Sequence, residues 1–208
     1  MNNLLTATIS SQTVFRALAT ALAILFMSYG MDVRGKRGTV NLAAPLWQRL
    51  MKGAAALLVG SFAALVWTIA SPDGLDWVAL IVAACGTALV VAAKRALGSG
   101  HTFTGQCHAR PRLVTTGIYA ITRNPLYLGV FICEAGALLC ALHTVPDVLP
   151  RHDVAVLTVF CTALAYAVSF NWTMARREAR QLELRCGDAY RAYAARVPFL
   201  FPLRTARS

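Results

Sequence analysis

Five stretches of the chain are long and apolar enough to cross a lipid bilayer, and polar loops separate them. A transmembrane helix needs about 20 consecutive, mostly apolar residues. The predicted spans cover residues 14–31, 53–71, 75–93, 126–143 and 154–175. The first contains only one charged residue, Arg16, which lies close enough to its start to reach the membrane surface. The pattern therefore predicts an all-α, polytopic membrane protein with a single integral domain over residues 1–208.

The composition agrees with this pattern and narrows the class of partner. Hydrophobic residues make up 57% of the 208 positions and charged residues only 14%, with a formal net charge of +11. A soluble domain carries nearer a quarter charged residues. The basic residues lie between apolar segments and form no stripe interleaved with aromatic residues. The expected partner is therefore the lipid bilayer, and a nucleic-acid partner is excluded.

Basic residues also predict the direction of the spans. They gather in the loop between spans one and two, in residues 94–125 and in residues 176–208, whereas the loop SPDGLD has none and the fourth loop has only Arg151. Lys and Arg stay on the cytoplasmic side of a membrane. We therefore expect the N-terminus outside, the C-terminus in the cytoplasm, and a multi-pass protein of the bacterial inner membrane.

The segment GIYAITRNPLYLGVF, residues 117–131, joins the third loop to the fourth span. Proline is well tolerated in the first turn of a helix, and asparagine before it can accept from a free backbone N–H. Asn124 and Pro125 therefore predict a helix start, with Tyr127 in the first turn. Gly129 permits the close approach of another backbone or of a ligand.

Residues 176–202, RREARQLELRCGDAYRAYAARVPFLFP, form the second polar stretch of interest. The fifth helix is expected to continue past the membrane through Glu178 until Gly187 stops it. Asp188 then caps a short helix with Tyr190 and Tyr193. By itself this pattern is equally typical of an amphipathic helix at the membrane surface.

Together the two stretches have the form LVTxGxYxxxRxPxYxG, then about fifty residues, then ExxxLxxxxGxxYxxYxxxVPxxxP. This arrangement resembles the isoprenylcysteine carboxyl methyltransferase and phospholipid methyltransferase superfamily, over roughly residues 90–202. The resemblance implies a methyltransferase-like core at residues 94–208, behind three N-terminal spans at 1–93. It also implies S-adenosyl-L-methionine as cofactor and a lipophilic or lipidated acceptor.

The resemblance further implies a cytoplasmic cofactor pocket. Its residues would be Gly117, Tyr119, Arg123, Asn124, Pro125, Tyr127, Gly129, Glu178, Tyr190 and Tyr193. In this pocket Arg123 can bind the cofactor carboxylate, and Glu178 can accept from the ribose or the ammonium group. The tyrosines can stack on adenine or contact the sulfonium.

Three positions depart from the family pattern. Asn124 replaces the usual histidine, Ala179 replaces the second of two glutamates, and Cys186 replaces a phenylalanine. Asparagine cannot carry charge or shuttle a proton, so a mechanism with that histidine as base does not transfer to this chain. The loss of the second glutamate can weaken cofactor binding or change the substrate.

Glu134 lies within the fourth span and is the third catalytic candidate, with Arg123 and Glu178. An intramembrane carboxylate is costly, so it indicates either contact with an acceptor headgroup or a protonated side chain bonded to another span. His101 is a further candidate for the same pocket. Cys107 with two histidines is too small a set for a structural zinc site, so we expect no metal.

Two other functions are compatible with the sequence. The C-terminal part of membrane sterol reductases, which use NADPH, is similar around the RxPxYxG motif, although those chains are longer. A non-catalytic scaffold or transport accessory with the same fold is the other alternative, favoured by the changes at Asn124 and Ala179.

Overall fold

The computed structural model describes residues 10–30, 39–100, 105–108 and 112–201. These residues form five long helices, α1 (Ser11–Gly30), α2 (Pro45–Thr68), α3 (Gly74–Leu97), α4 (Pro125–Val148) and α5 (Asp153–Arg196). Each is long and apolar enough to cross a membrane. The all-α membrane fold predicted from the hydropathy pattern is thus confirmed.

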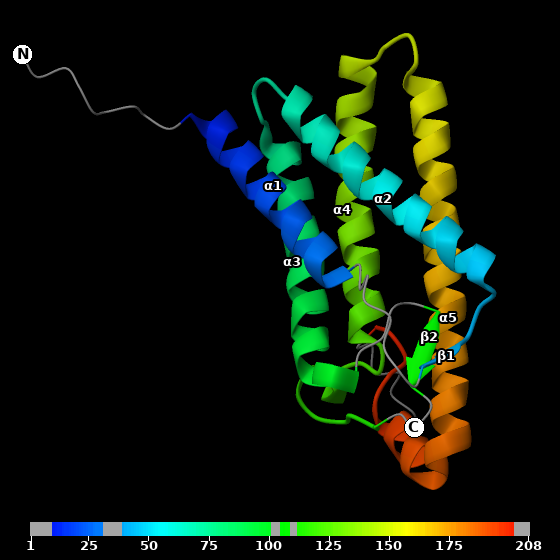
Figure 1. Cartoon of the computed structure of the whole chain (residues 1–208). Helices are drawn as coiled ribbons and strands as arrows, with labels where there is room; N and C mark the ends of the chain where they lie inside the picture. Colours follow the sequence, from blue (N-terminus) through cyan, green and yellow to red (C-terminus); the bar gives the residue numbers. More distant parts are fainter. Residues whose placement is uncertain (1–9, 31–38, 101–104, 109–111, 202–208) are drawn as a thin grey trace, which may run out of the picture.

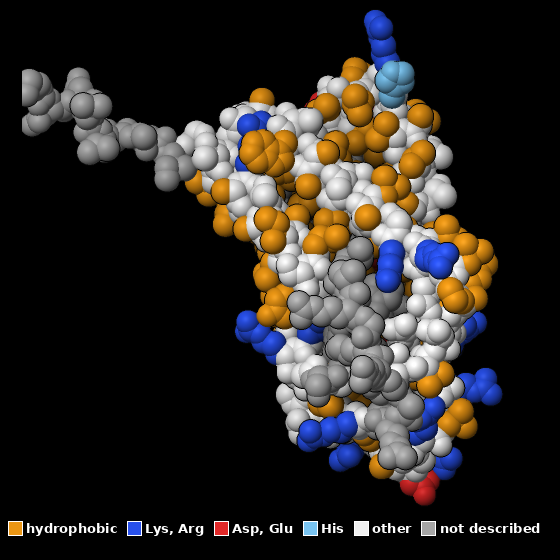
Figure 2. All heavy atoms as spheres, in the orientation of Figure 1, with side chains coloured by type: hydrophobic (Ala, Val, Ile, Leu, Met, Phe, Trp, Pro, Cys, Tyr) orange, Lys and Arg blue, Asp and Glu red, His pale blue; other side chains and the backbone are white. Residues whose placement is uncertain are grey.

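Successive helices run in opposite directions (Figure 1). α3, α4 and α5 stand side by side, while α1 and α2 cross them obliquely on one face. Arg16 of α1 donates to the carbonyl oxygens of Trp67 and Ile69 at 2.6 and 3.0 Å, so it binds the end of α2. Figure 2 shows most Lys and Arg side chains around the lower end of the molecule, where α5 ends. Which end faces the cytoplasm stays a prediction.

The most extensive helix contact joins α3 to α4 and depends on glycine. A Cβ atom built on Gly86 of α3 would lie 2.4 Å from the backbone nitrogen of Cys133, and one on Gly129 of α4 would lie 2.7 Å from the carbonyl oxygen of Gly86. Gly136 meets the backbone of Ala83 in the same way, at 2.6 Å. Small residues let two membrane helices approach to backbone contact. Gly129 therefore permits a helix contact rather than the approach of a ligand.

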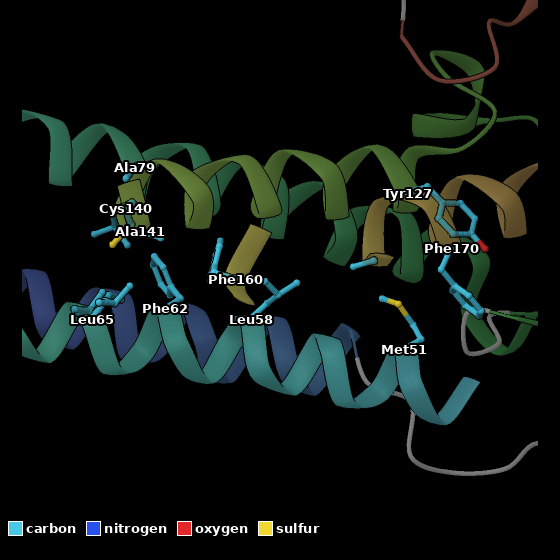
Figure 3. Packing of buried hydrophobic residues seen from close by; sticks show 14 of the residues in the cluster. Met51, Leu58, Phe62, Leu65, Ala79, Tyr127, Cys140, Ala141, Phe160 and Phe170 are labelled. Carbon is cyan, nitrogen blue, oxygen red and sulfur yellow. The ribbon is translucent and has the colours of Figure 1, made fainter. Parts of the chain in front are cut away.

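The core continues from this pair to α2 and α5. Met51, Leu58 and Phe62 of α2 are buried and point toward the facing helices (Figure 3). Phe160 and Phe170 of α5 complete the same cluster. The apolar faces of four helices thus meet around α4.

α5 has 44 residues, and its part before Gly187 is about 50 Å long, well above the roughly 30 Å thickness of the hydrocarbon layer. Its first half is the fifth span, and its second half continues beyond the membrane. Gly187 has φ of 51° and ψ of −125°, which a residue with a side chain rarely adopts, and it kinks the helix. Gly187 therefore ends the long helical part of α5, and a second, short helical part follows and ends at Arg196, as the sequence predicted.

Two short elements connect the loops at this end of the bundle. β1 (Thr39–Asn41) pairs antiparallel with β2 (Gln106–His108), so that Val40 lies opposite Cys107. Two 3-10 turns, η1 (Gly98–Gly100) and η2 (Gly117–Ala120), follow α3 and precede α4. These loops lie beside the extramembrane half of α5, where the candidate site forms.

Candidate functional site

A cavity lies between the loop before α4, the first turn of α4 and the second half of α5. It brings together seven of the residues that the resemblance assigned to a cofactor pocket. They are Tyr119, Arg123, Asn124, Tyr127, Glu178, Tyr190 and Tyr193. The two motifs, separated by about fifty residues in the sequence, thus line one cavity.

Glu178 and Tyr127 join the two walls of this cavity. Pro125 begins α4 and places Tyr127 in its first turn, as the sequence predicted. The Tyr127 hydroxyl donates to Glu178 Oε1 at 2.6 Å. Ala179, the next residue on α5, also lines the cavity. A glutamate at position 179, where the family pattern has one, would therefore line the same cavity.

Arg123 is held by aromatic residues from the C-terminal part of the chain. Its guanidinium carbon lies 5.9 Å from the ring centre of Tyr190 and 5.5 Å from that of Phe199. Its Nη1 donates to the Tyr190 hydroxyl at 3.3 Å, while its buried Nε has no hydrogen-bond partner among the described residues. Among the described residues no carboxylate pairs with this guanidinium, so it can pair with an anionic ligand.

Residues 122–124 bind the segment that follows α5. The Arg123 N–H donates to the Pro198 carbonyl at 2.9 Å. Thr122 Oγ1 and Asn124 Nδ2 donate to the carbonyls of Leu200 and Phe199, each at 2.7 Å. We call these three bonds the carbonyl clamp. It holds the C-terminal segment against the start of α4.

The clamp corrects the prediction that the Asn124 side chain caps α4. Asn124 is the residue before the helix, but its side chain makes no capping bond. Its amide faces the C-terminal segment, because a donor is needed there for the Phe199 carbonyl. An imidazole N–H at this position can donate in the same way, so asparagine preserves that part of the histidine's capacity.

The hydroxyls of two buried tyrosines, Tyr119 and Tyr193, stay neutral. Burial raises the pKa of Tyr119 far above its ordinary value, and burial raises that of Tyr193 to about 12. The Tyr193 hydroxyl donates to the Tyr119 carbonyl at 2.6 Å. This bond fixes the end of α5 to η2 across one side of the cavity.

Burial also raises the pKa of Glu178, to about 7, although the hydrogen bond from Tyr127 opposes this rise. A carboxyl group that titrates near neutral pH in a cavity also lined by an arginine is typical of functional sites. The site thus combines two arginines, Arg112 and Arg123, with one titratable acid and several neutral phenols.

Four predicted site residues do not line this cavity. Gly117 begins η2 with φ of 59°, which requires glycine there. Pro125 is buried at the start of α4, and Gly129 packs against α3. Glu134 lies about two turns beyond Tyr127 on α4 and lines a second cavity. The first three shape the site without facing it.

Sequence reasoning missed Cys107, Arg112 and Gln181 as lining residues. Cys107 reaches the site on β2, whose pairing with β1 has no clear motif. Arg112 adds a second cation to the lining, whereas its place in a basic loop predicts only the direction of the spans. No spacing rule points to Gln181, which follows from the continuation of α5.

Two groups resemble metal ligands in the described residues. Burial and the nearby Glu178 raise the pKa of Cys107, which keeps it a thiol rather than the thiolate that binds metals. His101 and the side chain of His108 lie outside the described residues. Asp73, Asp76 and His143 form a compact group at the opposite end. A capping box on α3 and a 2.9 Å His143–Asp73 pair account for that group.

Comparison with known proteins supports the first of the two motifs directly. Residues 76–171 match the family model described as phospholipid methyltransferase. The match runs from the first turn of α3 through α4 into the membrane half of α5, and it ends before Glu178. No curated protein matches the chain. This match to the phospholipid methyltransferase family model confirms the superfamily resemblance predicted from the motifs.

Proposed function

We propose that the protein transfers a methyl group from S-adenosylmethionine to a lipophilic acceptor that arrives from the bilayer. The observation that carries this proposal is the meeting of Arg123 and Glu178 in one cavity beside Tyr119, Tyr190 and Tyr193. The family match supports membrane methyltransferase chemistry in general. The cofactor, the acceptor and the roles of individual residues are our proposal.

The residues present fit the polar groups of this cofactor. Arg123 has a buried N–H without a partner among the described residues, which suits the carboxylate. Glu178 in its ionised form accepts from the ammonium or the ribose hydroxyls. The phenol rings offer faces for adenine or for the sulfonium. Bound here, S-adenosylmethionine supplies an electrophilic methyl group.

The protein contributes position and shielding to such a reaction. Methyl transfer is an in-line displacement, in which the acceptor lone pair forms the new bond as the carbon–sulfur bond breaks. A site that aligns the two reactants and excludes water lowers the barrier without a covalent step. The carbonyl clamp and the Tyr193–Tyr119 bond close one side of the cavity, which favours both effects.

Cofactor binding tests the proposal against the reductase and scaffold alternatives. We expect calorimetry of the purified protein to give micromolar binding of S-adenosylhomocysteine and none of NADPH. Binding of NADPH alone would indicate a reductase, and binding of neither would favour the scaffold. Transfer of labelled methyl to membrane lipids and to a panel of amines and thiols would then identify the acceptor.

Cofactor affinity is expected to depend on pH through Glu178. Its pKa of about 7 means that the empty site is protonated below neutral pH, and the protonated form cannot pair with an ammonium group. Affinity for S-adenosylhomocysteine should therefore rise about tenfold between pH 6 and pH 8. Calorimetry at the two pH values measures this rise, and Glu178→Gln should abolish it. An equal rise in that variant would assign the titration to another group.

The same titration has the opposite sign for stability of the empty protein. The folded-state pKa lies above the ordinary value of 4.5, so the folded chain binds more protons than the unfolded chain between these values. The contribution of Glu178 is therefore largest at low pH and is lost as pH rises through about 7. Deprotonation of Glu178 at high pH thus favours cofactor binding, whereas its protonation at low pH favours the stability of the protein without cofactor.

A further inference from the structure

A second cavity lies among the membrane-spanning parts of all five helices, apart from the site described above. Apolar side chains form most of its wall. They include Leu22 and Phe26 of α1, Met51 and Leu58 of α2, and Ala137 of α4. Figure 3 shows Met51 and Leu58 pointing from α2 toward the opposite helices.

Three polar side chains interrupt this apolar wall, and one of them, Thr87, already donates to the Ala83 carbonyl. Glu134 of α4 is only 9% exposed and Asn171 of α5 only 2% exposed, and both line the cavity. Glu134 Oε2 and Asn171 Nδ2 are buried without a hydrogen-bond partner among the described residues. Buried polar atoms are almost always satisfied, so each such atom needs an explanation. A ligand that enters the cavity can supply both partners.

Glu134 on α4 and Asn171 on α5 lie at the same separation along their helices from the Tyr127–Glu178 pair. Glu134 follows Tyr127 by seven residues on α4, and Asn171 precedes Glu178 by seven residues on α5. Seven residues are close to two turns, so each pair shares a helix face and is separated by about 10 Å along the axis. The helices are antiparallel, and Tyr127 bonds Glu178 directly. Glu134 and Asn171 therefore form a second polar layer, deeper in the membrane than the first.

The second half of α1 covers this layer without packing tightly. The buried residues of α1 are Phe15 and Ala19, both in its first half. The residues that line the cavity, from Leu22 to Gly30, come from the second half and none of them is buried. This part of the wall is therefore the least closely packed against the rest of the bundle.

The chemistry of the two free atoms limits what can bind. Asn171 Nδ2 is a donor and needs an acceptor, whereas Glu134 Oε2 accepts when ionised and can donate when protonated. A hydroxyl group satisfies both atoms in either state of Glu134. A quaternary ammonium has neither a donor nor a lone pair, and an alkane has no polar group. The apolar wall requires that the rest of the ligand is lipophilic.

We propose that this intramembrane cavity binds a lipophilic molecule through a hydroxyl group held between Glu134 and Asn171. The site is distinct from the cofactor pocket and does not depend on methyl transfer. Its ligand enters from the bilayer, and its hydrophobic chain lies against the residues of α1 and α2. Water is the competing occupant, since a polar cavity of this kind can be hydrated.

Photolabelling in nanodiscs of phosphatidylcholine tests the proposal on the full chain. The probe is a tetradecanol analogue with a diazirine in its chain, and labelled positions are mapped by mass spectrometry. We expect saturable labelling of the cavity walls, at Phe26, Met27 and Leu58, which excess tetradecanol lowers about tenfold. Tetradecane and tetradecyltrimethylammonium should leave it nearly unchanged.

Matched variants separate the cavity from the rest of the membrane surface. Asn171→Leu removes the donor and should weaken labelling about tenfold. Ala137→Leu fills the cavity and should weaken it similarly, whereas Ala135→Leu, at an exposed position of the same helix, should not. Equal competition by tetradecane would overturn the role of the hydroxyl. Labelling that does not saturate, or none at the cavity, would overturn the site and leave water as its occupant.

Discussion

Glu178→Ala is expected to weaken binding of S-adenosylhomocysteine at least tenfold, or about 1.4 kcal/mol. The carboxylate is the only acidic group lining the pocket within the described residues, and Tyr127 already orients it at 2.6 Å. Without it, neither the ammonium nor the ribose hydroxyls of the ligand find a charged acceptor. Arg123→Ala should have an effect of the same size, through the carboxylate end. Calorimetry at pH 8 measures both.

Charged residues near the pocket but outside it provide the controls. Glu183 lies on the same helix, with its side chain 49% exposed and paired with Arg191. Exposed pairs of this kind contribute little. Glu183→Ala should therefore retain the affinity of the unmodified protein, as should Arg180→Ala at an exposed position. Unchanged affinity in Glu178→Ala and Arg123→Ala would refute the assignment of the pocket.

Gly86→Ala is expected to destabilise the helix bundle by about 1–3 kcal/mol. The added methyl group would lie 2.4 Å from the Cys133 nitrogen and 2.5 Å from the Gly129 carbonyl oxygen. Both are backbone atoms of α4, so no side chain can rotate away and the helices must move apart. Gly129→Ala should act in the same way. Unfolding by titration with sodium dodecyl sulfate measures the loss.

Gly60 offers a matched control within another membrane helix. It lies in α2, and a Cβ atom there meets nothing within 4 Å. Gly60→Ala should leave stability unchanged or raise it slightly, because alanine is the better helix former. If Gly86→Ala unfolded at the same detergent concentration as Gly60→Ala, the close contact of α3 and α4 would be wrong.

The spans were predictable because bilayer thickness limits helix length, and this constraint acts on each segment alone. The helices nevertheless extend beyond the predicted bounds. α2 begins at Pro45, eight residues before the predicted span, whereas the continuation of α5 beyond the membrane to Gly187 was predicted. Hydropathy reports where lipid contacts the chain, whereas hydrogen bonding continues a helix into the polar region. The break at Gly187 was predictable as well, because glycine readily adopts the positive φ found there.

The pocket was predictable only as a set of residues. The motifs point to Arg123 and Glu178, but no local rule says that the Asn124 amide faces Phe199 instead of its own helix. That choice depends on a segment 75 residues later in the chain. Gly129 belonged to the motif for a similar reason, because its partner is the backbone of α3 rather than a ligand. A residue that belongs to a site motif can therefore act by fixing the packing around the site, without contacting the ligand.

The carbonyl clamp has a consequence for biosynthesis. A chain enters the membrane from its N-terminal end, so all five spans are made before residues 198–200, whose carbonyls accept from Thr122, Arg123 and Asn124. Closure of the pocket by the clamp therefore requires a chain that extends through Leu200. A chain interrupted earlier retains its membrane helices while its cofactor pocket stays open on one side.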